Sequence, residues 1–327
     1  LSTGMKFLEQ ELSAVTGQTF SGQAAFKLYD TYGFPLDLTQ DILKQKKLAV
    51  DEAGFQAAMA EQRARARAAG MGATAGEKLA PAWFAIRDRV PATEFLGYAK
   101  DHAEAQVLAL LDANLAEVQS LPAGAEGFAV FNQTPFYAES GGQVGDTGTI
   151  TTDTGTLLAQ VHDTQKIFGG TLFSHKLTAT TALKVGQSVT LQIDTARRDA
   201  TRRNHSVAHL AHAALKQVLG GHVFQKGSLV GPDKMRFDFS HNKAMTTEEI
   251  QAVETIVNQQ IWANAAVETK LMDKDAAINA GAEALFGEKY DDEVRVLSMG
   301  VGEGRAYSVE LCGGTHVSRT GDIGVFK

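Results

Sequence analysis

Cysteine is almost absent from this sequence, since its 327 residues include only Cys312. A single cysteine excludes an intramolecular disulfide and fits a reducing compartment. Long apolar runs are also missing: none approaches the roughly 20 residues that a membrane-spanning helix needs. These absences predict a soluble protein of the cytoplasm with no membrane partner.

Positive charge is in deficit as well, because 31 Lys and Arg stand against 38 Asp and Glu, for a formal net charge of -7. This balance excludes a protein coated in basic charge, although nucleic-acid binding needs only a local basic face. The chain is long enough for roughly two or three domains and needs no metal or disulfide to hold its core. A metal found here therefore serves chemistry or local geometry.

The first 90 residues have a helical pattern. Leu8, Leu12 and Val15 recur three to four residues apart, as do Leu38 and Ile42. Residues 91–194 change character, with short β-rich runs at 127–131 and 188–193 between Gly, Thr and Asp turns. We expect an N-terminal helical domain over 1–90 and a small β-barrel or sandwich over 91–194.

Residues 195–327 have a mixed pattern. Helices are expected at about 196–219 and 247–264, and strands at about 236–239, 267–272 and 294–300. The predicted fold class is thus α+β, with a helical domain, a small β-barrel and a two-layer α/β domain in that order.

Two pairs of side chains in this last region suit a metal. His205 and His209 are four residues apart, so on a helix they project from one face. Cys312 and His316 flank a Gly-rich turn that lets both side chains reach one ion. One thiolate and three imidazoles favour zinc, although four protein ligands usually mark a structural site.

Arginines gather in two places, and each group is either an ordinary solvated surface or a contact for RNA phosphates. The first group alternates with alanine in a helical segment: Arg63, Arg65 and Arg67. The second group begins the histidine helix and is the predicted RNA-binding set: Arg197, Arg198, Arg202 and Arg203.

An extended series of motifs resembles the editing domain of alanyl-tRNA synthetases. It includes Arg-Asn-His-Ser at 203–206 with His209, Gln-Lys-Gly-Ser-Leu-Val at 225–230, and Arg-Phe-Asp-Phe at 236–239. It continues through Ala-Leu-Phe-Gly-Glu-Lys-Tyr at 284–290 to the segment 308–316, Ser-Val-Glu-Leu-Cys-Gly-Gly-Thr-His. Threonyl-tRNA synthetases share the histidine and cysteine pairs, so these alone leave the amino acid open.

Two further segments favour the alanyl family. The Gly-rich run at 134–146 is similar to a motif of the β domain in alanyl-tRNA synthetases and in some free-standing alanyl editing proteins. Residues 30–39, Asp-Thr-Tyr-Gly-Phe-Pro-Leu-Asp-Leu-Thr, resemble the helical region that follows the aminoacylation core of the full synthetase. We therefore expect an internal part of a synthetase that lacks the ATP-dependent aminoacylation core.

The resemblance implies a function and a site. Such domains hydrolyse tRNA(Ala) mischarged with serine or glycine, which protects protein synthesis from error, and tRNA(Ala) is the implied partner, with no obligate protein partner indicated. The implied zinc ligands are His205, His209, Cys312 and His316, and the implied catalytic set is Gln225 with both helix histidines. The implied substrate contacts are Gly141, Gly142, Gln143 and Thr315.

The residues leave several alternatives open. Zinc either activates water or orients the substrate. Ala208 departs from the threonine common at this place in the family, which bears on the discrimination of serine from alanine. The rivals to a synthetase editing domain are a free-standing deacylase, a non-catalytic tRNA-binding module with structural zinc, and an unrelated zinc hydrolase of small esters.

Overall fold

The computed structural model describes residues 2–13, 15, 17–32, 36–46, 48–68, 80–284 and 292–327. They form two compact units, Leu1–Leu79 and Ala80–Lys327. Residues 33–35 and 285–290, which carry parts of the motifs above, lie outside the described residues, and so do the side chains of Arg63, Arg65 and Arg67.

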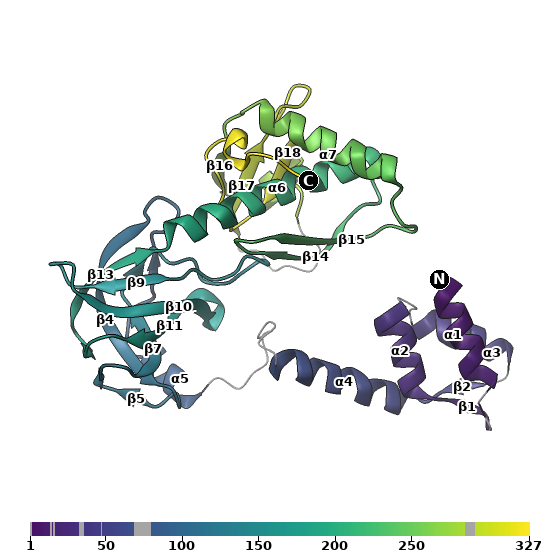
Figure 1. Cartoon of the computed structure of the whole chain (residues 1–327), viewed down its shortest axis with the longest axis horizontal. Coiled ribbons are helices and arrows are strands. Elements are labelled where there is room, and N and C mark those ends of the chain that lie inside the picture. The colour runs from purple at the N-terminus through teal and green to yellow at the C-terminus, as the bar shows by residue number, and fades with distance from the viewer. Residues whose placement is uncertain are drawn as a thin grey trace. The chain divides into compact units, whose positions relative to one another are not determined.

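The first unit is mainly helical and ends at Leu79, before the expected boundary at residue 90. Its core joins Leu8, Phe20, Leu28, Leu43 and Phe55, all of them buried. Two short strands, which the sequence did not predict, pair in parallel and join the segments at Thr19–Phe20 and Ala49–Val50. Its elements are α1 (Ser2–Ser13), β1 (Thr19–Phe20), α2 (Gly22–Tyr32), α3 (Leu36–Gln45), β2 (Ala49–Val50) and α4 (Glu52–Ala68) (Figure 1).

The second unit begins with a closed barrel of six strands in the cyclic order β4-β13-β9-β10-β11-β7, closed by the antiparallel pair β13 and β4. A barrel, rather than an open sandwich, is therefore what the β-rich region forms. In β13 the even burial alternation sends Val189, Leu191 and Ile193 into the barrel core with Phe131 and Ile150. The barrel strands are β4 (His102–Asp112), β7 (Glu126–Phe131), β9 (Gly148–Thr151), β10 (Leu157–Ile167), β11 (Leu172–Ala179) and β13 (Ser188–Ile193).

Short elements surround the barrel. Helix α5 packs on it through edge-to-face ring contacts of Trp83 with Phe128 and of Phe84 with Phe168, so this helix belongs with the barrel. The remaining elements here are α5 (Pro81–Arg87), β3 (Glu94–Phe95), β5 (Glu117–Val118), β6 (Ser120–Leu121), β8 (Gln133–Thr134), η1 (Phe168–Gly170) and β12 (Leu183–Lys184).

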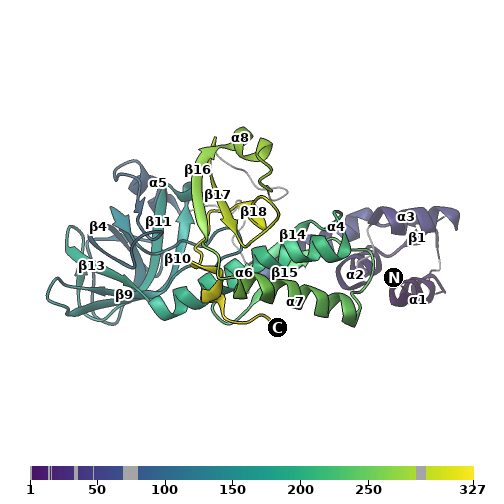
Figure 2. The same ribbon diagram turned by 90° about the horizontal axis from the view of Figure 1, so that it is seen from above.

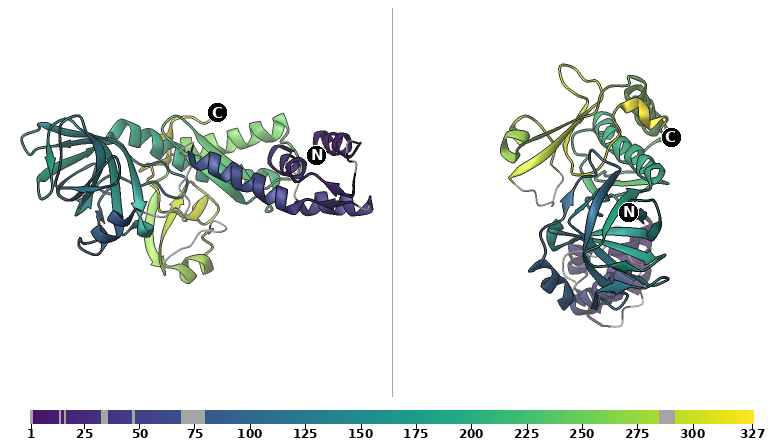
Figure 3. Two further views of the ribbon diagram at one scale, coloured as in Figure 1. Left: turned by 90° about the horizontal axis from the view of Figure 1, so that it is seen from below. Right: turned by 90° about the vertical axis from the view of Figure 1, so that its left-hand side faces the viewer.

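The rest of the unit is built around a long helix, α6, which starts directly after β13 (Figure 3). Helix α7 lies alongside it, and a three-stranded sheet, β16-β17-β18, covers one side of the helices (Figure 2). Val207, Leu210, Val257 and Leu297 meet in the core between them. The elements are α6 (Thr195–Leu219), β14 (Gln225–Val230), β15 (Met235–Phe239), α7 (Thr247–Trp262), β16 (Glu268–Asp273), α8 (Lys274–Asn279), β17 (Glu293–Met299), β18 (Ser308–Leu311) and η2 (Thr320–Ile323).

Backbone hydrogen bonds join the Gly-rich loop of the barrel to strand β14. Val230 donates its N–H to the Gly142 carbonyl at 2.7 Å, and Val144 donates to the Val230 carbonyl at 3.0 Å. Gly142 has φ +83°, and a Cβ there would lie 2.3 Å from the Ser228 hydroxyl oxygen. Only glycine allows this approach, so the motif brings the loop against β14.

A buried histidine in the barrel core makes the stability of this unit pH-dependent. His175 lies between Phe131 and Phe136, contacts the Thr134 hydroxyl at 2.8 Å, and has its pKa lowered by burial to about 4. Between pH 4 and 6.5 the unfolded chain binds a proton that the folded chain does not, so the contribution of His175 is complete above pH 6.5 and is lost as the pH falls towards 4. The loss amounts to roughly 3 kcal/mol.

The change His175→Gln keeps hydrogen-bonding atoms but cannot titrate. We expect it to flatten the fall in unfolding free energy between pH 6.5 and 4 relative to the original protein. Both tryptophans of the chain, Trp83 and Trp262, lie in the second unit, so tryptophan fluorescence during urea unfolding reports on this unit alone. An equal pH slope in both proteins would contradict the assignment.

Candidate metal centre

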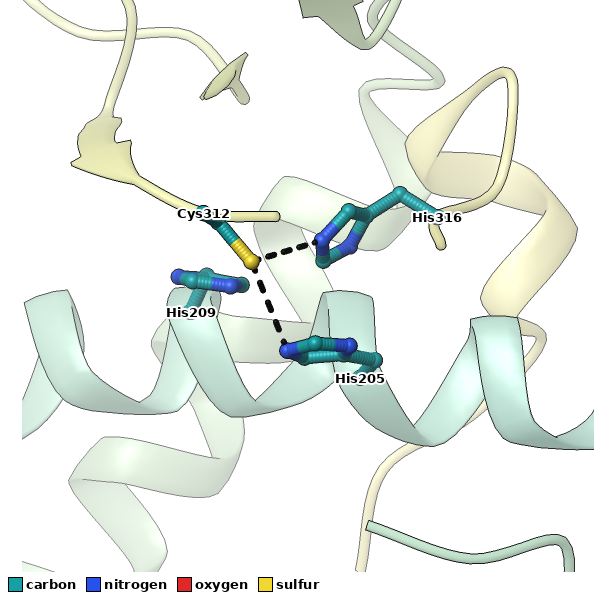
Figure 4. A group of neighbouring side chains, drawn as sticks. All are labelled: His205, His209, Cys312 and His316. Carbon is teal, nitrogen blue, oxygen red and sulfur yellow. Dashed lines mark hydrogen bonds between the residues drawn. The ribbon is translucent and has the colours of Figure 1, made fainter. Parts of the chain in front are cut away.

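The four predicted ligands come together in the second unit. Helix α6 carries His205 and His209 one turn apart on its buried face, and the turn after β18 brings Cys312 and His316 over them (Figure 4). Their ligand atoms all lie within 4.8 Å of one another. Residues more than a hundred positions apart in the sequence thus form one cluster that can hold a metal ion.

Each imidazole is oriented by a partner on its Nδ1 atom. The Gln143 amide oxygen lies 2.8 Å from Nδ1 of His205, and the Glu310 carboxylate lies 2.8 Å from Nδ1 of His209. The Ser206 hydroxyl lies 3.1 Å from Nδ1 of His316. A partner at Nδ1 leaves Nε2 as the ligand atom, which is how proteins fix the tautomer of metal-binding histidines.

The Nε2 atoms face the thiol. The Cys312 sulfur is 3.6 Å from Nε2 of His205 and 3.2 Å from Nε2 of His316, near the separation of about 3.5 Å that tetrahedral zinc bonds impose. Nε2 of His209 is buried and has no hydrogen-bond partner in the described part of the chain. A buried polar atom without a partner is costly, and a metal ion at the centre would satisfy it. The residues therefore fit a metal of the zinc type.

The pKa shifts of Cys312 and Glu310 also favour the binding of a cation. Burial raises the pKa of the Cys312 thiol, but the interactions with His205, His316 and His209 outweigh burial and lower it well below its usual value. Burial likewise opposes ionisation of Glu310, yet His209 and His212 lower its pKa to about 2. A thiolate and a carboxylate beside the imidazoles supply the negative charge that a divalent cation needs.

The cluster forms one wall of a cavity of about 240 Å³. Gln225, a predicted catalytic residue, and Gly141, a predicted substrate contact, line this cavity, and so does Ala208, which lies between the two histidines in the helix sequence. Gln143 and Thr315 do not line it, since both are buried and hydrogen-bonded to each other at 2.8 Å behind His205. At the metal cavity these two residues therefore hold the ligand His205, and their direct contact with substrate stays a prediction.

The predicted arginine set is divided by the fold. Arg198 is fully buried, where it forms an ion pair with Asp146 and donates hydrogen bonds to the carbonyls of Gly97 and Pro135. The prediction that Arg198 contacts RNA is thus wrong, because its guanidinium joins the helix to the Gly-rich loop inside the protein.

The other three arginines remain nearer the surface. Arg197 donates to the Gly145 carbonyl at 3.0 Å, and Arg202 forms ion pairs with Asp101 and Asp199. Arg203 is exposed. Their contact with tRNA stays a prediction.

Several residues of the site were missed from the sequence. Glu310 orients His209, Ser206 orients His316, and Tyr98 donates its hydroxyl to the Gly313 carbonyl at 2.6 Å. A signal was present for Glu310: it precedes Cys312 by two residues, and alternate residues of a strand share a face. No comparable signal linked Tyr98 to a turn that lies more than two hundred residues later.

Glu310 offers a test of the centre. We expect Glu310→Gln to weaken zinc binding by about 10- to 100-fold, because the amide keeps the shape but loses the charge that supports His209. Competition with a chromophoric chelator measures this affinity. The control Glu283→Gln removes a half-exposed carboxylate paired with Lys216 and should leave the affinity unchanged. Equal affinities for the original chain and Glu310→Gln would exclude this role.

Comparison with known proteins gives the family context of this geometry. A family model described as tRNA synthetases class II (A) matches residues 1–197, which is 197 of 327 residues. A second model, described as threonyl and alanyl tRNA synthetase second additional domain, matches residues 294–327 and so includes Cys312 and His316.

Several relatives match this chain over its whole length and carry the same name. Proteins called alanine–tRNA ligase from Parvibaculum lavamentivorans, Dinoroseobacter shibae and Granulibacter bethesdensis are each 54% identical to this chain over its whole length. The chain spans 37% of the length of each of these relatives. Within the described ranges, no helix has both the length and the apolar character needed to cross a membrane.

Proposed function

The chain belongs to the alanine–tRNA ligase family, and we propose that it carries out the editing step, the hydrolysis of tRNA(Ala) mischarged with serine or glycine. The observation that supports this proposal is the cavity, whose walls combine the metal-ligand cluster with the Gly-rich loop. An editing site needs a recess for an aminoacyl ester beside a group that polarises it; the cavity offers the recess, and a metal held by the cluster would polarise the ester.

We assign zinc to the cluster, with His205, His209, Cys312 and His316 as its ligands. When bound, zinc supplies positive charge that polarises a carbonyl group or acidifies water. The residues around the metal would position the water and the ester. The Gln225 amide, which both donates and accepts hydrogen bonds, would position the attacking water.

The Gly-rich loop would hold the ribose end of the ester. In the described part of the chain, the backbone N–H groups of Gly141 and Gly142 have no acceptor. Such N–H groups suit the oxygen that gains negative charge as the ester bond breaks. The bond cleaved joins the aminoacyl carbonyl carbon to the ribose oxygen; water adds its oxygen to the carbonyl and its proton passes to the ribose oxygen.

Selection of serine over alanine requires a partner for the serine hydroxyl. An apolar wall separates two such small side chains by only about 1 to 3 kcal/mol, whereas a polar group that loses its partner discriminates far more strongly. The Ala208 side chain offers no hydrogen bond, so another polar side chain of the cavity wall, such as Gln225 or Ser228, would have to provide it.

In the longer ligase, we propose that another region attaches alanine to tRNA(Ala) with ATP in the cytoplasm, while this chain removes the wrong esters. Four protein ligands also suit a structural metal, which favours a second candidate, a tRNA-binding module without hydrolytic activity. The two candidates differ in one outcome, ester cleavage.

The test is a deacylation time course with seryl-, glycyl- and alanyl-tRNA(Ala). The editing function predicts rapid loss of the seryl and glycyl esters and survival of the alanyl ester. Binding of tRNA without cleavage of any ester would reject hydrolysis and support the binding module. Rapid cleavage of a free seryl methyl ester would instead indicate a small-ester hydrolase.

A further inference from the structure

The cavity at the metal centre is too small for more than the end of a nucleic acid. Its volume of about 240 Å³ lies below the range of about 300 to 1,000 Å³ typical of pockets for drug-sized ligands. An aminoacyl ester can enter it, but the strand that carries the ester has to pass over the rim. The rim residues therefore meet the backbone of that strand.

Arg295 is the cationic side chain of the rim on the β17 side. It lines the metal cavity and also a second cleft of about 160 Å³, and Gly314 likewise lines both. Its guanidinium carbon lies 3.3 Å from the centre of the Tyr98 ring, and one of its nitrogens donates to the Gly314 carbonyl at 3.3 Å. The side chain is thus fixed in place by stacking and by a hydrogen bond to the turn.

Arg295 has no ion-pair partner in the described part of the chain, although Glu293 also lines the metal cavity. Among the residues that the structure describes, no carboxylate lies within ion-pair distance of Arg295. The second cleft is lined by Arg295, Arg202 and the hydroxyl residues Thr269 and Ser318, with no acidic residue in its described lining. Arg202 already pairs with Asp101 and Asp199, so Arg295 is the guanidinium that a ligand can use.

A preorganised guanidinium without an acidic partner, next to hydroxyl groups, suits a phosphate. We propose that Arg295 binds the backbone phosphate that precedes the terminal nucleotide of an RNA 3′ strand, and that the second cleft receives the strand as it leaves the metal cavity. This inference rests on the proposed function, because it takes the occupant of the cavity to be an RNA 3′ end.

A thermodynamic cycle tests the contact in the metal-loaded full chain. The probe is a non-acylated tRNA(Ala) acceptor-stem hairpin with its single-stranded 3′ end, made either unmodified or with a neutral methylphosphonate at the last linkage. We expect Arg295→Gln and the methylphosphonate each to weaken binding about tenfold, and the combination to weaken binding no further. The log–log salt dependence of the unmodified probe should fall by about 0.7 in Arg295→Gln, the contribution of one single-strand phosphate.

Two further variants serve as controls for this experiment. Arg295→Lys keeps the positive charge, so it should keep the salt dependence even if some affinity is lost with the stacking. Arg89→Gln removes an exposed arginine paired with Glu117 on the barrel and should bind both probes as the original chain does. Losses that multiply to about 100-fold in the combination, or Arg295→Gln binding at the original affinity, would overturn the proposal.

The cycle is independent of hydrolysis. If the original chain binds the hairpin and shows the coupling but cleaves no seryl ester, the phosphate contact stands and the editing function fails. If the chain cleaves seryl-tRNA(Ala) and shows no coupling between Arg295 and the last linkage, the editing function stands and the phosphate contact fails.

Discussion

Replacing Cys312 with alanine is expected to reduce bound zinc from about one ion per chain to near zero and to slow seryl-tRNA(Ala) hydrolysis more than about 100-fold. The thiolate is the anionic ligand of the cluster, and the three imidazoles left behind bind a cation less tightly. Loss of an outer-shell partner alone typically costs 10- to 100-fold in metal affinity or activity, so loss of a ligand costs more. Elemental analysis and the deacylation rate measure the two effects.

The control for this change is His162→Asn, which alters an exposed histidine of the barrel that is hydrogen-bonded to Thr178. It should retain both zinc and activity. Unchanged zinc stoichiometry in Cys312→Ala would remove the thiolate from the ligand set. Lost zinc with an unchanged rate would make the metal structural and leave hydrolysis to the surrounding residues.

Replacing Arg198 with methionine is expected to destabilise the second unit by about 3–5 kcal/mol. The change leaves the Asp146 carboxylate buried without its cation and removes the donors to the carbonyls of Gly97 and Pro135. Urea unfolding followed by tryptophan fluorescence reports on this unit. The exposed Arg203 on the same helix is the matched control, and Arg203→Met should change the unfolding free energy by no more than about 0.5 kcal/mol.

A double variant separates the ion pair from the packing around it. With Asp146→Leu added to Arg198→Met, no unpaired charge remains, so the combined loss should be smaller than the sum of the two single losses. The carbonyls of Gly97 and Pro135 still lack donors, so stability should return only in part. A single-variant loss below about 1 kcal/mol would contradict the role of this ion pair as the joint between barrel and helix.

The arginine cluster shows what sequence reasoning could have used. Arg198 precedes His205 by seven residues and His209 by eleven, which places all three on one face of α6. If the two histidines lie on the buried face of the helix, Arg198 is expected to be buried as well. The helical period separates Arg198 and Arg202 from Arg197 and Arg203, but it does not separate Arg198 from Arg202, which is partly buried in ion pairs with Asp101 and Asp199.

The metal ligands were predictable because their signals are local: an i, i+4 pair on a helix and a thiol–imidazole pair around a glycine turn. Their orienting partners were not, since Gln143 lies on a loop of the barrel and joins His205 only through the tertiary fold. The same limit applies to the barrel. Alternation predicted strands such as β13, but the pairing of β13 with β4 that closes the ring depends on contacts far apart in sequence.

Zinc-dependent editing is tested by measuring hydrolysis of seryl-tRNA(Ala) with one preparation of the chain, divided into metal-free and zinc-restored samples. We expect the metal-free sample to leave the ester intact, added zinc to restore hydrolysis, and alanyl-tRNA(Ala) to survive in both samples. Equal hydrolysis of seryl-tRNA(Ala) with and without zinc, or none in either sample while the tRNA remains bound, would contradict zinc-dependent editing.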